Sequence, residues 1–460
     1  MFAVAHDAPT ASDGRATTPI NLPENSRDIE ATPEAALVRP RQVTSLIKNA
    51  TALMVSGAGS AIIGLGFWAL AAHRAPARFV GRASAELAIM SLLSILAQLS
   101  FGVTFERFLP VAGPRAGRFV RRAYIASSLS AVAIATLYVS LHLSATTVPR
   151  ALEWRILFVV ATLLWTIFSL QEPILVGLRE ARWVPVQSMA FSTAKLVLLP
   201  LFLSVSSQYG IFVAWNVPVI AIVLAVNWVL FAKRIPAHEI HSVPHEPMPS
   251  PKEMLGLTVA RYVSQLITVM EPSIVAFIVI SRLGPVANAH YYLTAQIAWG
   301  AILVLNSISR SFVVEASSDP RAFRRHTRTA LRAGLIVTSA IVVGGLIAAP
   351  WVLRIFGPQY AATGTLLMRL IIIALPGYAV SIFYSAFAWL DRRVWWMTAR
   401  DLFSLVVYLG VILALIGRLG INAVGVASVV EAGLLGVFFL PRVVRRYRAA
   451  VIGDANAASD

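Results

Sequence analysis

Twelve long apolar runs follow one another along this sequence and limit what it can fold into. Each is about 20 to 28 residues long, and about 20 apolar residues are enough to cross a bilayer as an α-helix. Only 13% of the 460 residues are charged, about half the share of a soluble domain, so the chain cannot cover a water-facing surface. We therefore expect an all-α polytopic membrane protein with about 12 transmembrane helices. The runs cover approximately residues 49–72, 85–105, 123–143, 156–177, 184–205, 210–231, 255–281, 287–309, 331–353, 362–389, 394–416 and 420–440.

The positions of the basic residues predict the orientation of these spans. With the N-terminus in the cytoplasm, the cytoplasmic segments hold 24 Lys and Arg residues and the opposite loops hold eight. The positive-inside rule therefore places both termini in the cytoplasm and the chain in the cytoplasmic membrane. The net charge of +17 is explained by this topology, so we expect no nucleic acid among the partners. No cysteine is present, which excludes disulfides and thiol chemistry.

The longest polar interruption, residues 233–252, divides the chain into six spans and six spans. Pro76 and Glu106 in the first half match Pro285 and Glu315 in the second, both shifted by about 209 residues, which indicates a parallel repeat of the kind found in secondary transporters. A coincidence of loop chemistry is the alternative. We predict a disordered cytoplasmic tail, an N-terminal six-helix lobe, a cytoplasmic linker, a C-terminal six-helix lobe and a short cytoplasmic tail, at residues 1–43, 44–234, 235–252, 253–450 and 451–460.

Ionisable residues at membrane depth are the candidate functional residues, because each costs about 2.5–3.5 kcal/mol at a helix centre. In the seventh run, Arg261, Gln265, Thr268 and Pro272 recur on one stripe of a helix, with Glu271 beside it. We interpret this stripe as the lining of an aqueous interior; a buried polar seam is the alternative. Pro272 is predicted to act as a hinge.

Further charges occur in other spans. Lys195, Arg261 and Arg369 are candidates for a cationic cavity that binds phosphate. They could instead pair internally with the acids at membrane depth, Glu271, Asp401 and Glu431.

Enzymatic chemistry has no support in the sequence. There is no phosphate-binding G-x-x-x-x-G-K-[ST] motif and no long outer loop with catalytic carboxylates. His238, His241 and His245 occupy a Pro-rich linker, and we interpret them as solvated residues. We expect no enzyme activity, no metal site and no cofactor.

Several segments resemble bacterial polysaccharide-biosynthesis membrane proteins, the oligosaccharide or O-antigen-type flippases of the multidrug/oligosaccharidyl-lipid/polysaccharide (MOP) exporter superfamily. They are KNATALMVSG, GFWALAAHRAP, VGRASAE and AQLSFGVTFERFLP in the first half and ISRLGPVANAHYYLTAQ in the second. The resemblance covers about residues 44 to 445. It implies two six-helix lobes of the MATE-like architecture around a central cavity.

The resemblance also implies a function, which is to flip a polyprenyl-diphosphate-linked oligosaccharide across the cytoplasmic membrane by alternating access. The implied partners are the lipid-linked oligosaccharide, membrane lipids and a glycan polymerase or glycosyltransferases. Lys195, Arg261, Arg369 and Gln265 would bind the cargo. Glu271, Glu431 and Asp401 would couple transport to an ion or proton.

Two other functions stay open. A cation-coupled multidrug or metabolite exporter of the related MATE branch would need an acidic lumen in which Glu271, Glu431 and Asp401 dominate over the cations. A membrane scaffold without transport activity would not need its midplane charges.

Overall fold

The computed structural model describes residues 59–141, 147–148, 150–241, 251–318, 323–391 and 394–457. The chain divides into two units, Met1–Ala50 and Thr51–Asp460, and every described residue belongs to the second. The predicted tail, residues 1–43, and His245 lie outside the described residues. Within them the chain is all-helical and contains no strand, which confirms the predicted fold class.

Ten helical segments are long and apolar enough to cross a membrane in the described part of the chain. One of them, Gln265–Val313, has 49 residues and would be about 73 Å long if straight, more than twice the hydrocarbon core of a bilayer. It belongs to α9 (Pro251–Ser318), which breaks at Gly284, with φ 85° and ψ 174°. Because φ is positive there, glycine suits the break. The α9 segment therefore supplies two spans, as predicted, and the protein is a multi-pass membrane protein.

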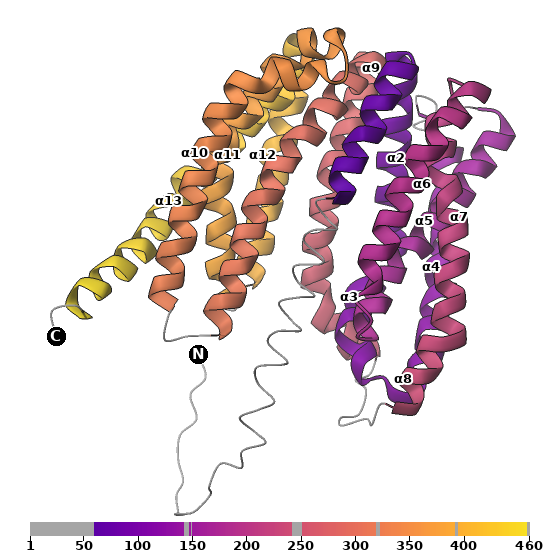
Figure 1. Ribbon diagram of the computed structural model, residues 1–460, viewed down its shortest axis with the longest axis horizontal. Coiled ribbons are helices and arrows are strands. Elements are labelled where there is room, and N and C mark those ends of the chain that lie inside the picture. Colours follow the sequence, from indigo (N-terminus) through magenta and orange to yellow (C-terminus); the bar gives the residue numbers. More distant parts are fainter. Residues whose placement is uncertain are drawn as a thin grey trace, which may run out of the picture. The chain divides into compact units, whose positions relative to one another are not determined.

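The remaining elements follow the predicted order along the chain (Figure 1). A helix over residues 59–74 precedes them. The N-terminal half contains α2 (Ala77–Ala97), α3 (Phe101–Phe108), α4 (Ala116–Ser140), α5 (Leu152–Gly177), α6 (Trp183–Val205), α7 (Gly210–Val229) and α8 (Ile235–His241). The C-terminal half contains α9 and then α10 (Phe323–Arg354), α11 (Pro358–Leu390), α12 (Val394–Leu419) and α13 (Asn422–Ala457).

The second predicted span, 85–105, differs from the structure. The helix α2 begins at Ala77, directly after Pro76, and ends at Ala97. Arg78 and Arg82 in its first turns delayed the start of the apolar run in the sequence. Leu99 and Ser100 have positive φ angles of 50° and 66° and separate α2 from α3.

Helices also extend into the residues predicted as the cytoplasmic linker and the C-terminal tail. Residues 235–241 of the predicted linker form α8, which carries His238 and His241. At the other end, α13 continues to Ala457, into the predicted tail. The domain boundaries themselves stay a prediction.

Helix packing follows the two halves of the sequence. In the N-terminal half α5 packs on α2, α4, α6 and α7, and in the C-terminal half α11 packs on α9, α10, α12 and α13 (Figure 1). The two halves meet where α2 runs along α9. Pro285, within α9, and Pro76, the N-cap residue of α2, are the residues matched in the predicted repeat.

The contact between α2 and α9 is close and polar. Gly81 lies so near Pro285 that a Cβ on Gly81 would overlap the Pro285 carbonyl oxygen. The Asn288 amide donates to the carbonyl oxygen of Gly81 at 2.7 Å and to Ser84 Oγ at 3.0 Å, and the Ser273 hydroxyl donates to the carbonyl oxygen of Ala88 at 2.9 Å. Hydrogen bonds therefore fix the register of α2 on α9.

Candidate functional site

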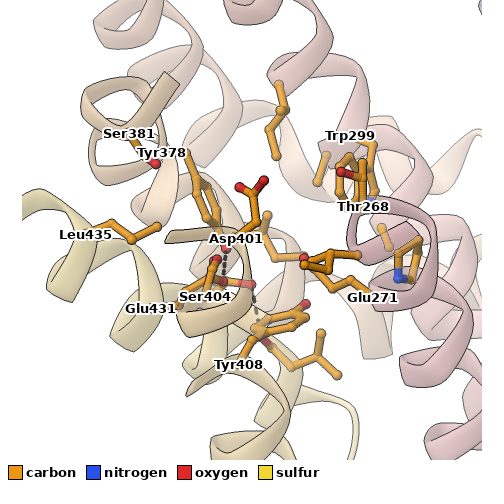
Figure 2. Close-up of a pocket in the computed structure, with 18 of the residues that line it drawn as sticks. Thr268, Glu271, Trp299, Tyr378, Ser381, Asp401, Ser404, Tyr408, Glu431 and Leu435 are labelled. Atoms are coloured by element: carbon orange, nitrogen blue, oxygen red, sulfur yellow. Dashed lines mark hydrogen bonds between the residues drawn. The ribbon is translucent and has the colours of Figure 1, made fainter. Parts of the chain in front are cut away.

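A cavity of about 170 Å³ lies within the C-terminal half, between α9, α11, α12 and α13. We call it the acidic cavity, because Glu271, Asp401 and Glu431 all line it. Figure 2 shows Glu271 on the α9 side and Asp401, Ser404 and Glu431 on the opposite side. Its other polar lining residues are Thr268, Tyr291, Tyr378, Ser381, Arg400, Tyr408 and Ser428.

Helical spacing brings these residues to one place. On α12, Arg400, Ser404 and Tyr408 are four residues apart and therefore share a face. On α13, Ser428 and Glu431 are three residues apart on the face turned towards α12. A polar stripe on each helix thus becomes one wall of a shared cavity.

Glu431 is held by two neighbours. Its side chain is 3% exposed, and its carboxylate accepts a hydrogen bond from the Tyr378 hydroxyl at 2.8 Å and another from the Ser404 hydroxyl (Figure 2). Both donors are neutral, so the carboxylate is oriented without a contacting cation.

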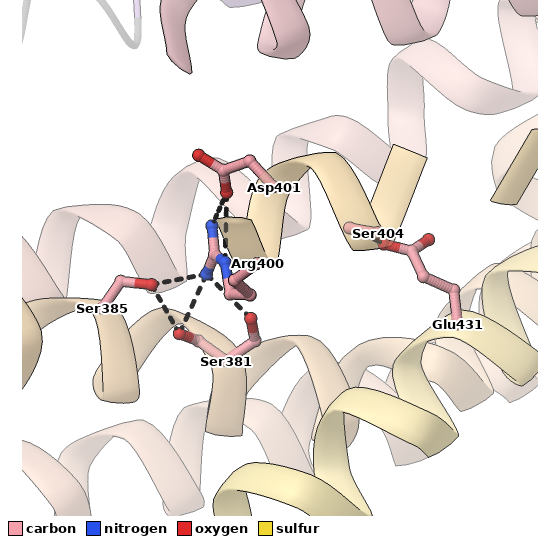
Figure 3. A network of polar contacts seen from close by, with 6 residues as sticks. All are labelled: Ser381, Ser385, Arg400, Asp401, Ser404 and Glu431. Carbon is pink, nitrogen blue, oxygen red and sulfur yellow. Dashed lines mark hydrogen bonds and ion pairs between the residues drawn. The ribbon is translucent and has the colours of Figure 1, made fainter. Parts of the chain in front are cut away.

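Arg400 supplies the positive charge of the acidic cavity. Its guanidinium pairs with Asp401 and donates to the Ser381 hydroxyl at 2.8 Å, to the Ser381 carbonyl oxygen at 3.2 Å and to the Ser385 hydroxyl (Figure 3). These contacts tie α12 to α11. One arginine therefore faces three carboxylates, and its donors are engaged by Asp401 and the two serines.

Glu271 differs from the other two acids. It lines the acidic cavity, and no hydrogen bond or ion pair joins it to another residue in the described part of the chain. Pro272 lines the same cavity, while the residue of α9 with non-helical φ and ψ is Gly284. The break in α9 thus lies twelve residues beyond the proposed hinge.

Lys195 and Arg369, two of the candidate cations, lie on different helices in different halves. Lys195 lies on α6 in the N-terminal half, whereas Arg369 is exposed on α11 and donates to the Leu346 carbonyl oxygen at 3.1 Å. Arg261 is part of α9, and its side chain lies outside the described residues. Gln265 is exposed and does not line the acidic cavity.

Lys195 is buried among aromatic rings. Its side chain is 5% exposed, and its Nζ lies 3.6 Å from the ring centroid of Trp215, 4.7 Å from that of Phe191 and 5.5 Å from that of Phe67. No carboxylate from the described residues pairs with it. Cation–π attraction therefore offsets only part of the cost of burying this charge.

Sequence reasoning missed several buried or cavity-lining polar residues in both halves. Tyr378, Ser404 and Tyr408 line the acidic cavity. In the sequence each of them is a single polar residue within an apolar run. The four-residue spacing of Ser404 and Tyr408 after Arg400 is the signal that could have found them. Glu86, a 5% exposed acid on α2, was also missed, since it falls at the start of a predicted span.

The acidic cavity does not have the geometry of a tight metal site. Among the residues that the structure describes, no three His, Asp or Glu side chains lie close enough together to hold one metal ion. The arrangement suits a proton or a loosely held cation, which needs charge compensation more than a full set of ligands.

Comparisons with known proteins give the fold. No protein-family model matches the sequence, and no curated protein matches it. Among solved structures the chain has the fold of MOP superfamily transporters. One is an inward-facing multidrug resistance MATE family transporter, with TM-score 0.61, 15% identity and coverage of 85% of this chain and 95% of the other.

Two more structures of this fold differ in what they are described as doing. The lipid II flippase MurJ, in an inward closed conformation, matches with TM-score 0.55 and 16% identity over 87% of this chain and 90% of its own. A MOP superfamily transporter from Pyrococcus furiosus, described as having a binding pocket of reverse polarity, matches with TM-score 0.54 and 15% identity over 87% and 95%. At these identities the likeness concerns the fold.

Proposed function

We propose that this protein is a coupled membrane transporter of the exporter or flippase kind. Its energy would come from a proton or cation that neutralises Glu271, Asp401 and Glu431 in one state and leaves in the other. The observation that carries this proposal is the convergence of the three carboxylates, from three helices, on one cavity with a single arginine. Each buried charge costs about 2.5–3.5 kcal/mol in a membrane, so stability alone does not account for the set.

A binding measurement on the full-length protein tests the coupling site. We would compare radioactive sodium binding and proton release, in detergent, between the wild type and the variants Glu271→Gln, Asp401→Asn and Glu431→Gln. We expect each variant to lose the cation- or proton-binding signal. Glu86→Gln is the matched control, because Glu86 is also a buried acid but does not line the acidic cavity. Wild-type binding by all three variants would reject the coupling site.

For the cargo we propose a polyprenyl-diphosphate-linked oligosaccharide, moved across the cytoplasmic membrane for cell-surface polysaccharide biosynthesis. The sequence resemblance over residues 44–445 supports this cargo, and so does Lys195. A cation without a carboxylate partner attracts phosphate, and the aromatic rings around it offer surfaces on which sugar rings stack. In this proposal Lys195 contacts the diphosphate when the N-terminal half opens to the cargo.

Cells depleted of the protein provide the test. We expect the completed lipid-linked oligosaccharide to accumulate in lipid extracts and the surface glycan to disappear. The wild-type gene should reverse both effects, and Lys195→Met should not. Lys233→Met is the matched control, because Lys233 also lies over a tryptophan, with its Nζ 5.0 Å from the Trp228 ring centroid, but is exposed. Full activity of Lys195→Met would remove Lys195 from the cargo site.

A second function, a cation-coupled exporter of drugs or metabolites, is favoured by one observation. The acids share a cavity, whereas Lys195 and Arg369 lie elsewhere, and an acidic cavity attracts cationic cargo. Depleted cells would then keep an unchanged lipid pool and become more sensitive to small cationic compounds. The same depletion experiment therefore separates the two cargo classes.

A further inference from the structure

An apolar groove of about 520 Å³ runs between α10, α11 and α13, away from the acidic cavity. Its volume is within the usual range of small-molecule sites, about 300–1,000 Å³. Residues such as Leu331, Ile373, Phe383 and Leu440 line it. Figure 1 shows α10, α11 and α13 side by side in the C-terminal half.

Glycines form the floor of this groove. Gly377 on α11 lies so close to α13 that a Cβ there would overlap the backbone carbonyl oxygen of Ala432. Gly433, the residue after Ala432 on α13, also lines the groove, and a Cβ there would meet no atom within 4 Å. The groove therefore lies beside a tight contact of α11 with α13 and has room for a larger side chain at Gly433.

A small basic pocket lies at one end of the two helices that form the groove floor. It has a volume of about 150 Å³ and is lined by Arg442, Arg445 and Arg446 of α13 and by Asp391 at the end of α11. Arg446 pairs with Asp391 at 2.6 Å. Neither Arg442 nor Arg445 contacts a carboxylate among the described residues, so the pocket keeps an excess of two positive charges.

The groove and the basic pocket continue into each other along both helices. On α11, Phe383 lines the groove and Phe387, one turn later, lines the pocket. On α13, Val443 lines the groove and Arg446, three residues later, lines the pocket. The groove follows α13 from Val429 to Val443, about 21 Å at about 1.5 Å per residue. That length exceeds the depth of one leaflet, about 15 Å, half of a hydrocarbon core.

We propose that the groove and the basic pocket together bind one anionic glycerophospholipid of the surrounding membrane, with an acyl chain in the groove and the phosphate at Arg442, Arg445 and Arg446. Arginine matches phosphate oxygens in a bidentate manner, and basic pockets at the cytoplasmic ends of transmembrane helices attract anionic lipids. The positive-inside distribution of basic residues predicts that this end is cytoplasmic. The site is separate from the acidic cavity and does not depend on the proposed transport function.

Native mass spectrometry of the full-length protein, titrated with phosphatidylglycerol or phosphatidylcholine, tests the proposal. We expect the wild type to retain one phosphatidylglycerol in preference to phosphatidylcholine. Gly433→Leu should fill the groove, and Leu335→Trp, at a position 68% exposed on its edge, is a second filling variant should the first fail to fold. A filled groove, or replacement of the three pocket arginines by glutamine, should weaken retention by about tenfold or more. The arginine variant is R442Q/R445Q/R446Q.

Matched controls separate the site from general effects. Gly410→Leu adds the same side chain on α12, where a Cβ also meets no atom within 4 Å. The triple variant R118Q/R121Q/R122Q removes three exposed arginines from α4. Both controls should retain the lipid as the wild type does.

Three results would overturn the proposal. Equal retention by all variants would mean that the lipid binds to any basic surface. Loss in the arginine variant but not in a folded groove-filling variant, or displacement by inorganic pyrophosphate alone, would mean that a phosphate binds without the groove. Tighter binding of a polyprenyl phosphate than of phosphatidylglycerol would assign the site to a different lipid.

Discussion

The pair formed by Arg400 and Asp401 allows a quantitative test of how the acidic cavity is balanced. The two side chains are 19% and 13% exposed. Removing one partner of a buried ion pair costs about 3–5 kcal/mol, because the other charge is left without compensation. Since some exposure remains here, we expect Asp401→Leu to lower the free energy of unfolding by about 2–3 kcal/mol.

Removing both charges should cost much less. In the double variant Arg400→Met/Asp401→Leu neither member of the pair is left without the other, and replacing a buried pair by apolar residues is often neutral. The Ser385 hydroxyl and the Ser381 carbonyl oxygen keep a partner without Arg400, because the hydroxyl donates to that oxygen at 2.8 Å. We therefore expect the double variant to lie within about 1 kcal/mol of the wild type.

Equilibrium unfolding in mixed micelles of the wild type, both single variants and the double variant measures this directly. The four free energies form a double-mutant cycle, whose coupling energy should reach about 2 kcal/mol. If the single effects add to within about 0.5 kcal/mol, the pair does not stabilise the cavity, and the charge balance described above is wrong.

Three further outcomes can be checked on the purified protein. Lys195→Met should raise the thermal unfolding midpoint, because it removes a buried cation with no carboxylate partner among the described residues; a lower midpoint would mean that the aromatic contacts outweigh the cost of burial. Asn288→Ala should lower the free energy of unfolding by about 1–3 kcal/mol, since it removes two buried hydrogen bonds between α2 and α9; an unchanged denaturation curve would show that the register is held by packing alone. Because the chain has no cysteine, single cysteines at Arg324 and Arg418 should react with a membrane-impermeant maleimide from opposite sides, Arg324→Cys from the cytoplasm; labelling from the same side would reject the predicted topology.

The spans could be predicted because each depends on local composition alone. The break at Gly284 within α9 is visible in the sequence as a Gly-Pro pair between two apolar runs. The break after α2 is not, because Leu99 and Ser100 adopt positive φ angles that their residue types rarely choose. The true start of α2 was hidden by charges in its first turns.

The candidate site could be predicted only in part. Periodicity within one helix placed Thr268 and Pro272 on a common face, and both line the acidic cavity. Gln265 was assigned to the same stripe, but it is exposed and does not line the acidic cavity. Whether Lys195 meets Arg369 depends on which helices pack together, and that information is not present in the spacing of residues along one helix.

The contact of Gly81 with Pro285 sets a mechanical limit on this molecule. No side chain separates the two backbones there, so the two helices cannot come closer together at that point. A rotation of α2 on α9 would pivot about this contact, which we call the fulcrum. The far end of α2, at Ala97, lies about 24 Å from that point, and there the Tyr262 hydroxyl of α9 donates to the carbonyl oxygens of Ile95 and Leu96 at 3.2 Å. Each degree of rotation therefore displaces Ala97 by about 0.4 Å, while Asn288, close to the fulcrum, keeps its hydrogen bonds.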